Sequence, residues 1–359
     1  MHSGSRPSRR LALVAVAGVL GLSGCGVHLE EDAPAIPLIP KRTPIGGESA
    51  LLTLLHATQE LADALRSGEG GRRAHAFADV HTHQAAVLDS ALRRKGVPAD
   101  LLAPPTSATG GGAVLDRERA ALALVHDLYA AAPLDLLPTL ASLAAARTVV
   151  CRALTSDGTS AGSSSGSGTS SPTDPASAIG TEASGSGTAT SDIGTGSASA
   201  QTPAEPGLAG LPALASPAAA LPYLAASRAA VYGLEVVAAR THKDLRTAAA
   251  TTLESVRGLA LAQESAAGAD APPAPTAYRL PLNADDEESG RRLAEYLAGR
   301  LVDAYAAALT TTTDAGTHAS TEQIAAARTD VAVGAAWLAD AALLADDWGL
   351  ALAPFPGLT

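Results

Sequence analysis

The sequence is poor in cysteine, in aromatic residues and in strand-forming runs, and each shortage excludes a class of protein. Its 359 residues contain two cysteines, Cys25 and Cys151, which excludes a small fold stapled by several disulfides. Aromatic residues make up 3% of the chain, and alternating runs of β-branched and polar residues are scarce. Alanine dominates instead, and alanine is the strongest helix former. The composition therefore predicts an all-α protein.

Basic residues are also in short supply. The chain has 25 Lys and Arg against 36 Asp and Glu, a formal charge of −11. Removing residues 1–24 removes three arginines and no acid, which leaves 22 basic residues and a charge of −14. Proteins that bind nucleic acid carry basic patches. We therefore expect no nucleic-acid partner and no electrostatic attachment to anionic lipid.

The first 24 residues have the pattern of an export signal. Arg6, Arg9 and Arg10 precede an apolar run of twelve residues, 11–22. A helix of that length is too short to cross a hydrocarbon core of about 30 Å. A basic start, a short apolar core and small residues at its end are typical of a signal peptide. The pattern does not decide between the general secretory and the twin-arginine routes.

The signal ends in Leu-Ser-Gly-Cys at residues 22–25, which resembles a bacterial lipobox. That resemblance implies cleavage before Cys25 and a diacylglycerol on its thiol. Two or more acyl chains hold a protein firmly on a bilayer, whereas one holds it marginally. We expect a lipid-anchored protein on the extracytoplasmic face of the cell membrane, with a periplasmic site if the cell has an outer membrane. The alternative is a plain signal peptide followed by a chance cysteine.

Two low-complexity segments divide the mature chain. Residues 25–47 contain Pro34, Pro37, Pro40 and Pro44, and such a composition predicts an extended tether. Residues 155–207 are rich in Ser, Gly, Thr and Ala without any Lys or Arg, which predicts a disordered linker. Between and after them lie two predicted helical domains, residues 48–154 and 208–359.

Helical periodicity predicts four amphipathic helices in each domain, at residues 49–66, 72–95, 114–131 and 134–154, and at residues 217–241, 245–267, 285–309 and 321–348. Four such helices with short connections favour a bundle. Both halves run helix, short break, helix, Pro-rich loop, and two helices. This shared order indicates a degenerate internal duplication.

The C-terminal half, about residues 214–359, is similar to an actinobacterial ferritin-like domain family of unknown function. Three motifs carry the resemblance in order, namely Ala-Ala-Val-Tyr-Gly at 229–233, Ala-Tyr-Arg-Leu-Pro at 277–281 and Pro-Phe-Pro-Gly-Leu at 354–358. The resemblance implies a four-helix ferritin-like bundle with no established activity. Members usually show an acid–His pair just before the first motif, where this chain has Ser227 and Arg228.

Metal ligands of the ferritin-like type are missing. Such sites use inward glutamates and two Glu-x-x-His motifs, and the sequence contains no Glu-x-x-His. We therefore predict no cofactor. His75, Asp79 and His83 recur at i, i+4, i+8, a spacing able to chelate a divalent ion. Their helical phase lies opposite the apolar face, which favours a solvated surface, with a surface metal site as the alternative.

Three charged residues fall among apolar positions of the C-terminal helices, Arg228, Glu235 and Arg300. A lone buried charge is costly, so we expect Glu235 to pair with Arg300 or Arg228 inside the bundle. An arginine would then supply the positive charge that metal supplies in a ferritin. The alternative is a small rotation that places all three at the rim.

Cys151, Trp337 and Trp348 lie on apolar faces and are predicted to be core residues. The sequence contains no Gly-rich phosphate loop, serine-nucleophile elbow or Cys/His zinc spacing. The favoured function is a non-enzymatic, lipid-anchored envelope protein that binds a partner. The alternative is a ferritin-like protein that oxidises or stores metal outside the cytoplasmic membrane. A solute-binding lipoprotein would need two α/β lobes, which the scarcity of strand patterns disfavours.

Overall fold

The computed structural model describes residues 42–69, 73–104, 112–163, 213–313 and 319–358. The described residues from Pro44 onward belong to one compact unit with its own core. Its described residues are helical or irregular and include no strand, which confirms the all-α prediction. The signal peptide, the lipid-attachment site Cys25, most of the tether and the linker beyond residue 163 lie outside the described residues.

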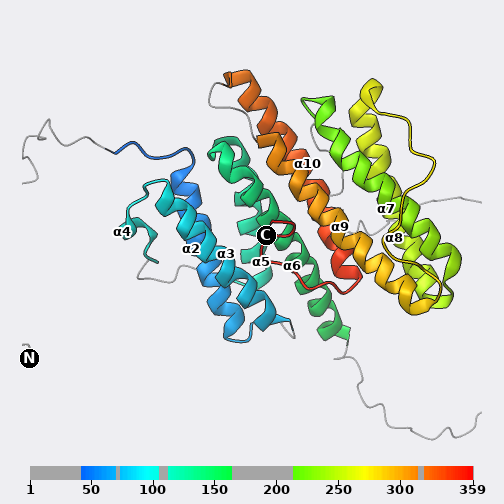
Figure 1. The fold of residues 1–359 in the computed structure, drawn as a ribbon. Helices are drawn as coiled ribbons and strands as arrows, with labels where there is room; N and C mark the ends of the chain where they lie inside the picture. The colour runs from blue at the N-terminus through cyan, green and yellow to red at the C-terminus, as the bar shows by residue number, and fades with distance from the viewer. Residues whose placement is uncertain (1–41, 70–72, 105–111, 164–212, 314–318, 359) are drawn as a thin grey trace, which may run out of the picture. The chain divides into compact units, whose positions relative to one another are not determined.

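The N-terminal half is a bundle of four main helices, α2 (Glu48–Arg66), α3 (Ala74–Arg94), α5 (Val114–Ala131) and α6 (Leu137–Ser163) (Figure 1). Helix α2 packs against α3 and α5, and α5 packs against α6. A short helix α4 (Ala99–Leu102) lies within the predicted loop, and a 3-10 turn η1 (Leu134–Leu136) precedes α6. Leu102 of α4 is buried, so this turn fixes the loop to the bundle.

The C-terminal half repeats this arrangement with α7 (Leu221–Arg240), α8 (Lys243–Ala267), α9 (Glu287–Thr313) and α10 (Thr321–Asp347). The 3-10 turns η3 (Pro217–Ala220) and η4 (Gly268–Asp270) flank α7 and α8. Helix α7 packs against α8 and α9, and α9 packs against α10. The order of pairing is the same in both halves, which agrees with the predicted internal duplication.

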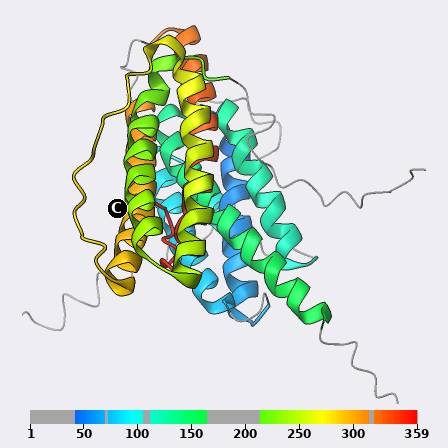
Figure 2. The same ribbon diagram turned by 90° about the vertical axis from the view of Figure 1, so that its right-hand side faces the viewer.

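The two bundles pack together through their last helices. Helix α6 lies along α10, with further contacts from α5 to α10 and from α6 to α9 (Figures 1 and 2). Helix α6 is therefore covered on most sides, and its alanines and valines allow the close approach that this needs. Within the described chain, one helix, Leu134–Asp157, is long and apolar enough to cross a membrane. Most of it is buried in the bundle, as expected for a core helix.

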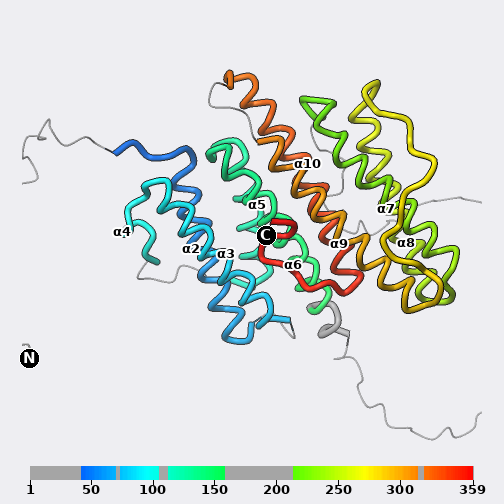
Figure 3. The backbone as a smooth tube through the Cα atoms, in the orientation of Figure 1, coloured from blue at the N-terminus to red at the C-terminus, as the bar shows by residue number. Residues whose placement is uncertain are grey.

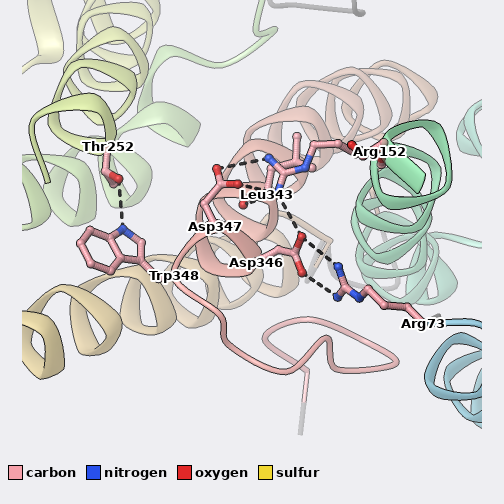
Figure 4. A network of polar contacts seen from close by, with 8 residues as sticks. Arg73, Arg152, Thr252, Leu343, Asp346, Asp347 and Trp348 are labelled. Atoms are coloured by element: carbon pink, nitrogen blue, oxygen red, sulfur yellow. Dashed lines mark hydrogen bonds and ion pairs between the residues drawn. The ribbon is translucent and has the colours of Figure 1, made fainter. Parts of the chain in front are cut away.

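An ion-pair network ties the end of α10 to the N-terminal half (Figure 4). Asp346 accepts hydrogen bonds from Arg73, at 2.8 Å, and from Arg152, at 3.1 Å, and Arg152 also pairs with Asp347 at 2.9 Å. Burial alone would raise the pKa of Asp346, but the two arginines outweigh it and hold that pKa below its usual value. Beside them Trp348 donates from Nε1 to Thr252 Oγ1 at 3.0 Å, which joins the end of α10 to α8.

The C-terminal tail, residues 349–358, turns back between the two halves (Figure 3). Gln84 Nε2 donates to the Pro354 carbonyl at 2.8 Å, and Ser142 Oγ donates to the Pro356 carbonyl at 2.8 Å. Gly357 has φ +71, and a Cβ there would lie 2.7 Å from the Val302 carbonyl oxygen of α9. The motif at 354–358 therefore contacts α3, α6 and α9 together, and it needs glycine to do so.

The observed helices agree with the predicted ones to within a few residues, with one larger difference. Helix α6 runs to Ser163, nine residues beyond the predicted end at Leu154. Thr155 Oγ1 donates to the Cys151 carbonyl at 2.8 Å and Ser156 Oγ to the Arg152 carbonyl at 3.1 Å. These bonds reach back one turn, so the helix accommodates the polar side chains.

Candidate functional site

The prediction that Glu235 pairs with Arg300 or Arg228 inside the bundle is wrong, and the alternative, in which all three lie at the rim, describes the structure. Glu235 pairs with Arg257 at 2.7 Å, and both side chains are more than two-fifths exposed. Arg228 pairs with Glu264 at 3.1 Å, and Arg300 is exposed beside Asp303. Helix α7 is rotated so that Ser227, Ala230 and Leu234 face inward, which places the charged residues at the rim.

In the interior of the C-terminal half, three uncharged polar side chains from α7, α8 and α9 hydrogen-bond to one another. Ser227 Oγ donates to Gln263 Oε1 at 2.7 Å, Gln263 Nε2 donates to Tyr305 Oη at 2.6 Å, and Tyr305 Oη lies 2.5 Å from Ser227 Oγ. If Tyr305 donates to Ser227, the three side chains form a closed ring in which each donates once. Burial raises the pKa of Tyr305 to about 12. Trp337 and Trp348 are buried as predicted.

Arg228 and Glu235 line a pocket on the outer face of α7 and α8. On α7 the lining residues are Arg228, Val231, Tyr232 and Glu235, and on α8 they are Arg257, Ala260, Leu261 and Glu264. Both helices thus read Arg-x-x-apolar-apolar-x-x-Glu. Because α7 and α8 are antiparallel neighbours, the arginine of each meets the glutamate of the other. An ion pair closes each end, and four apolar residues form the floor between them.

Residues 274–278 form the third wall of the pocket. Arg228 Nη1 donates to the Pro272 carbonyl at 2.6 Å, which ties this segment to α7. The rings of Tyr232 and Tyr278 lie 5.8 Å apart, so the motifs at residues 229–233 and 277–281 meet here. The pocket has a volume of about 440 Å³, and Leu261 in its floor is 69% exposed. Volumes of about 300–1,000 Å³ are usual for small-molecule sites.

The N-terminal half encloses a charged centre that the sequence analysis missed. Arg147 of α6 donates from Nη1 to Glu118 Oε2 of α5 at 2.8 Å and from Nη2 to Thr58 Oγ1 of α2 at 2.7 Å. Arg147, Glu118 and Thr58 have no exposed surface. An arginine thus does occupy a bundle interior beside a carboxylate, but in the N-terminal half and not in the C-terminal one.

His81 of α3 completes this centre in a defined tautomer. The Pro354 carbonyl can only accept, so Gln84 turns its NH₂ toward the tail and its Oε1 toward His81 Nδ1, 2.9 Å away. Nδ1 therefore carries a hydrogen. In the neutral ring, Nε2 then presents a lone pair 3.6 Å from Glu118 Oε1, and neither of these two atoms has a hydrogen-bond partner. Burial lowers the pKa of His81, which Glu118 opposes and Arg147 reinforces.

The remaining candidates do not form a reactive or metal-binding site. His75, Asp79 and His83 are exposed on α3. Among the described residues, no group of three His, Cys, Asp or Glu side chains is placed to hold a metal ion. Cys151 is only partly buried, and desolvation raises the pKa of its thiol to about 12, which makes it a poor nucleophile.

Comparison with known proteins identifies the C-terminal half alone. Residues 219–359 match a family model described as a domain of unknown function, DUF4439. This span covers α7 to α10 and every residue that lines the pocket. No curated protein and no solved structure matches the chain. A domain of unknown function thus lies where the resemblance of the three motifs predicted one.

Proposed function

We propose that this protein is an exported, lipid-anchored envelope protein that binds a ligand without transforming it. The observation that carries the proposal is the pocket between α7, α8 and residues 274–278. It is concave, it has the volume of a small-molecule site, and its floor exposes Leu261 to solvent. It also lies within the matched domain, and two of the three family-type motifs contribute tyrosines to it.

The chemistry of the pocket favours binding over catalysis. Its four charged side chains are engaged in two ion pairs, Arg228–Glu264 and Glu235–Arg257. The remaining lining residues are uncharged, and their polar side-chain groups are the hydroxyls of Tyr232, Tyr278 and Thr276. Both carboxylates are held by arginines, and a carboxylate held in this way is not free to act as a general base.

The metalloprotein alternative meets an obstacle in the N-terminal centre. Glu118 and His81 are the ligand types that a metal would use, but the Glu118 carboxylate already holds the Arg147 guanidinium at 2.8 Å. A divalent cation there would face a fixed positive charge in a fully buried site, where like charges repel strongly. The guanidinium neutralises the carboxylate directly, so we assign this centre to stability.

Native mass spectrometry of the protein purified from membranes tests the binding role. We expect a bound small molecule on the wild type and on Tyr296→Glu, because Tyr296 is 41% exposed and lies outside the pocket. Leu261→Glu places a charge on the floor and should lose the bound mass. Equal bound mass on all three proteins would show that the pocket is not the binding site.

Metal analysis of a soluble chain starting at Arg42 tests the alternative, since the compact unit begins at Pro44. We expect iron, manganese and zinc only at background level. Stoichiometric metal that is lost in Glu118→Gln would favour the metalloprotein function instead.

The anchor is tested at Cys25. Cys25→Ser should abolish labelling by a radioactive fatty acid and move the protein out of the detergent phase, because the thiol that carries the lipid is gone. Unchanged partition into detergent would contradict lipid anchoring and leave the plain signal peptide as the better interpretation.

A further inference from the structure

The structure also indicates which kind of molecule the pocket accepts. We propose that its ligand is uncharged and mainly apolar, about 10 Å long, with an aromatic or branched aliphatic body. This inference rests on the proposed binding function and deepens it. Three features carry it, namely the pairing of the pocket's charges, the length of its floor and the small amount of exposed apolar surface around it.

The charges of the pocket are compensated within the pocket. Each end holds one arginine and one glutamate in contact, at 3.1 Å and 2.7 Å. Arg228 is 12% exposed and also donates to the Pro272 carbonyl, so its hydrogen-bonding capacity is largely used. An ionised ligand group would have to displace one partner of a pair. A neutral ligand leaves both pairs intact, and the ion pairs then limit its length.

The floor between the ion pairs sets that length. Arg228 and Glu235 are seven residues apart on α7, as are Arg257 and Glu264 on α8. At a rise of 1.5 Å per residue, the ends are about 10 Å apart. Val231, Tyr232, Ala260 and Leu261 lie within this interval, and Tyr278 stands over one side. A planar ring or a branched chain would contact these side chains along its whole length.

A small molecule fits this surface better than a protein does. A stable protein interface buries about 800 Å² on each partner around a cluster of apolar anchors. Among the described residues, Leu261 is the only exposed large apolar side chain that lines the pocket. Leu101, Leu282 and Tyr296 are the other exposed ones, and they do not line it. The apolar surface is therefore concave and confined.

Two fluorescent probes that differ by one charge test the ligand class. N-phenyl-1-naphthylamine is neutral, and 1-anilinonaphthalene-8-sulfonate has the same ring system with a sulfonate. We expect the soluble chain from Arg42 to bind the neutral probe about tenfold more tightly than the anionic one. Leu261→Glu should weaken the neutral probe by about tenfold or more, because burial of a leucine side chain contributes a factor of that order. Tyr296→Glu is the matched control and should change neither constant.

A second variant tests the charge pairing itself. Glu235→Gln leaves Arg257 with only Glu254, 3.7 Å away, so the pocket gains a positive charge. We expect this variant to bind the sulfonate probe several-fold more tightly than the wild type does while the neutral probe changes little. Circular dichroism should show that the variants remain folded, since Leu261 and Glu235 are both exposed.

The outcomes separate this inference from the binding function. If the wild type prefers the sulfonate probe and Leu261→Glu abolishes that binding, the pocket binds ligands but the uncharged class is wrong. If neither probe depends on Leu261, the pocket does not bind apolar molecules, and both proposals fail. If Glu235→Gln leaves the preference between the probes unchanged, the ion pairs do not select the ligand.

Discussion

The two halves of this protein share one helical arrangement and differ in the polar side chains at their centres. In the N-terminal half, Glu118 and Arg147 meet at the centre with no exposed surface. In the C-terminal half, the centre is the uncharged set of Ser227, Gln263 and Tyr305, and the arginines and glutamates of α7 and α8 lie outside. The buried pair contacts side chains from α2, α3, α5 and α6, so it depends on how these four helices pack. The exposed pairs join α7 and α8 alone, and the surface between these pairs can contact a ligand.

The largest effect should come from breaking the buried pair. Glu118→Ala leaves the Arg147 guanidinium without its carboxylate in a closed interior, and we expect a loss of about 3–5 kcal/mol in the free energy of unfolding. Urea unfolding followed by circular dichroism measures it. Replacing both residues, as Glu118→Leu with Arg147→Met, should recover much of the loss, because no unpaired charge then remains. A loss below about 1 kcal/mol in the single variant would contradict a buried, structural pair.

A smaller effect is expected at the uncharged centre of the other half. Tyr305→Phe removes the hydroxyl that accepts from Gln263 and lies beside Ser227, so two buried polar groups lose a partner. The expected cost is about 1–3 kcal/mol, which is less than for Glu118→Ala because no charge is stranded. A cost equal to that of Glu118→Ala would remove the contrast between the two centres.

The stability should depend on pH through titratable groups whose pKa differs between the folded and unfolded chain. Burial lowers the pKa of His81, so the unfolded chain takes up a proton near pH 6.5 that the folded chain resists. Its contribution is complete above pH 6.5 and is lost as the pH falls below that value. The pKa of Asp346 is also lowered, and its contribution is lost at more acidic pH, below 3.8. Thermal melts between pH 4.5 and 8 measure the first effect.

His81→Gln should flatten the decline in stability between pH 6.5 and 4.5 without removing it. His126 should contribute less, because its side chain is exposed even though partial desolvation lowers its pKa. A decline that is identical in the wild type and in His81→Gln would contradict this assignment.

The smallest effect on stability should come from the pocket. Glu235→Ala breaks the pair with Arg257. In this pair the Glu235 side chain is 46% exposed and the Arg257 side chain is 43% exposed. Exposed pairs contribute about 0.2–1 kcal/mol, and solvent screening places this one in the lower part of that range. Urea unfolding should therefore shift little, whereas binding of the sulfonate probe changes. A loss as large as that of Glu118→Ala would mean that the pocket residues support the fold.

Helix positions followed from the sequence because apolar residues recur with the helical period and because glycine and proline interrupt them. The rotation of α7 did not follow. This helix is apolar on most of its surface, so periodicity does not fix which side faces inward. Ser227 and Arg228 are adjacent, and a rotation of about 100° exchanges them. That rotation moves Arg228 and Glu235 from the predicted interior to the outer face, where they line the pocket.

The charged centre of the N-terminal half did leave a signal. Glu118 lies in the stripe formed by Val114, Ala121 and Val125, and Arg147 lies between Ala144 and Val150. A charge within an apolar stripe predicts a buried partner. The identity of the partner depends on how α5 and α6 pack, which one sequence does not contain. The contact of Gln84 with Pro354, 270 positions away, was likewise beyond reach.

The repeated pattern Arg-x-x-apolar-apolar-x-x-Glu was readable in both α7 and α8. Taken alone, each copy looks like an ordinary solvated helix face. Only the antiparallel packing of the two helices turns the copies into two ion pairs around a shared floor, and only the segment 274–278 makes that floor concave.

The measurement that tests this account most directly is urea unfolding of Glu118→Gln and Leu261→Glu with and without N-phenyl-1-naphthylamine. A ligand that binds only the folded chain raises the free energy of unfolding by about 1.4 kcal/mol when its concentration is ten times the dissociation constant. Glu118→Gln should start from a lower stability and gain the same increment as the wild type. Leu261→Glu should start from wild-type stability and gain nothing. Loss of the increment in Glu118→Gln with its retention in Leu261→Glu would contradict the assignment of stability to the inner charges and of binding to the outer pocket.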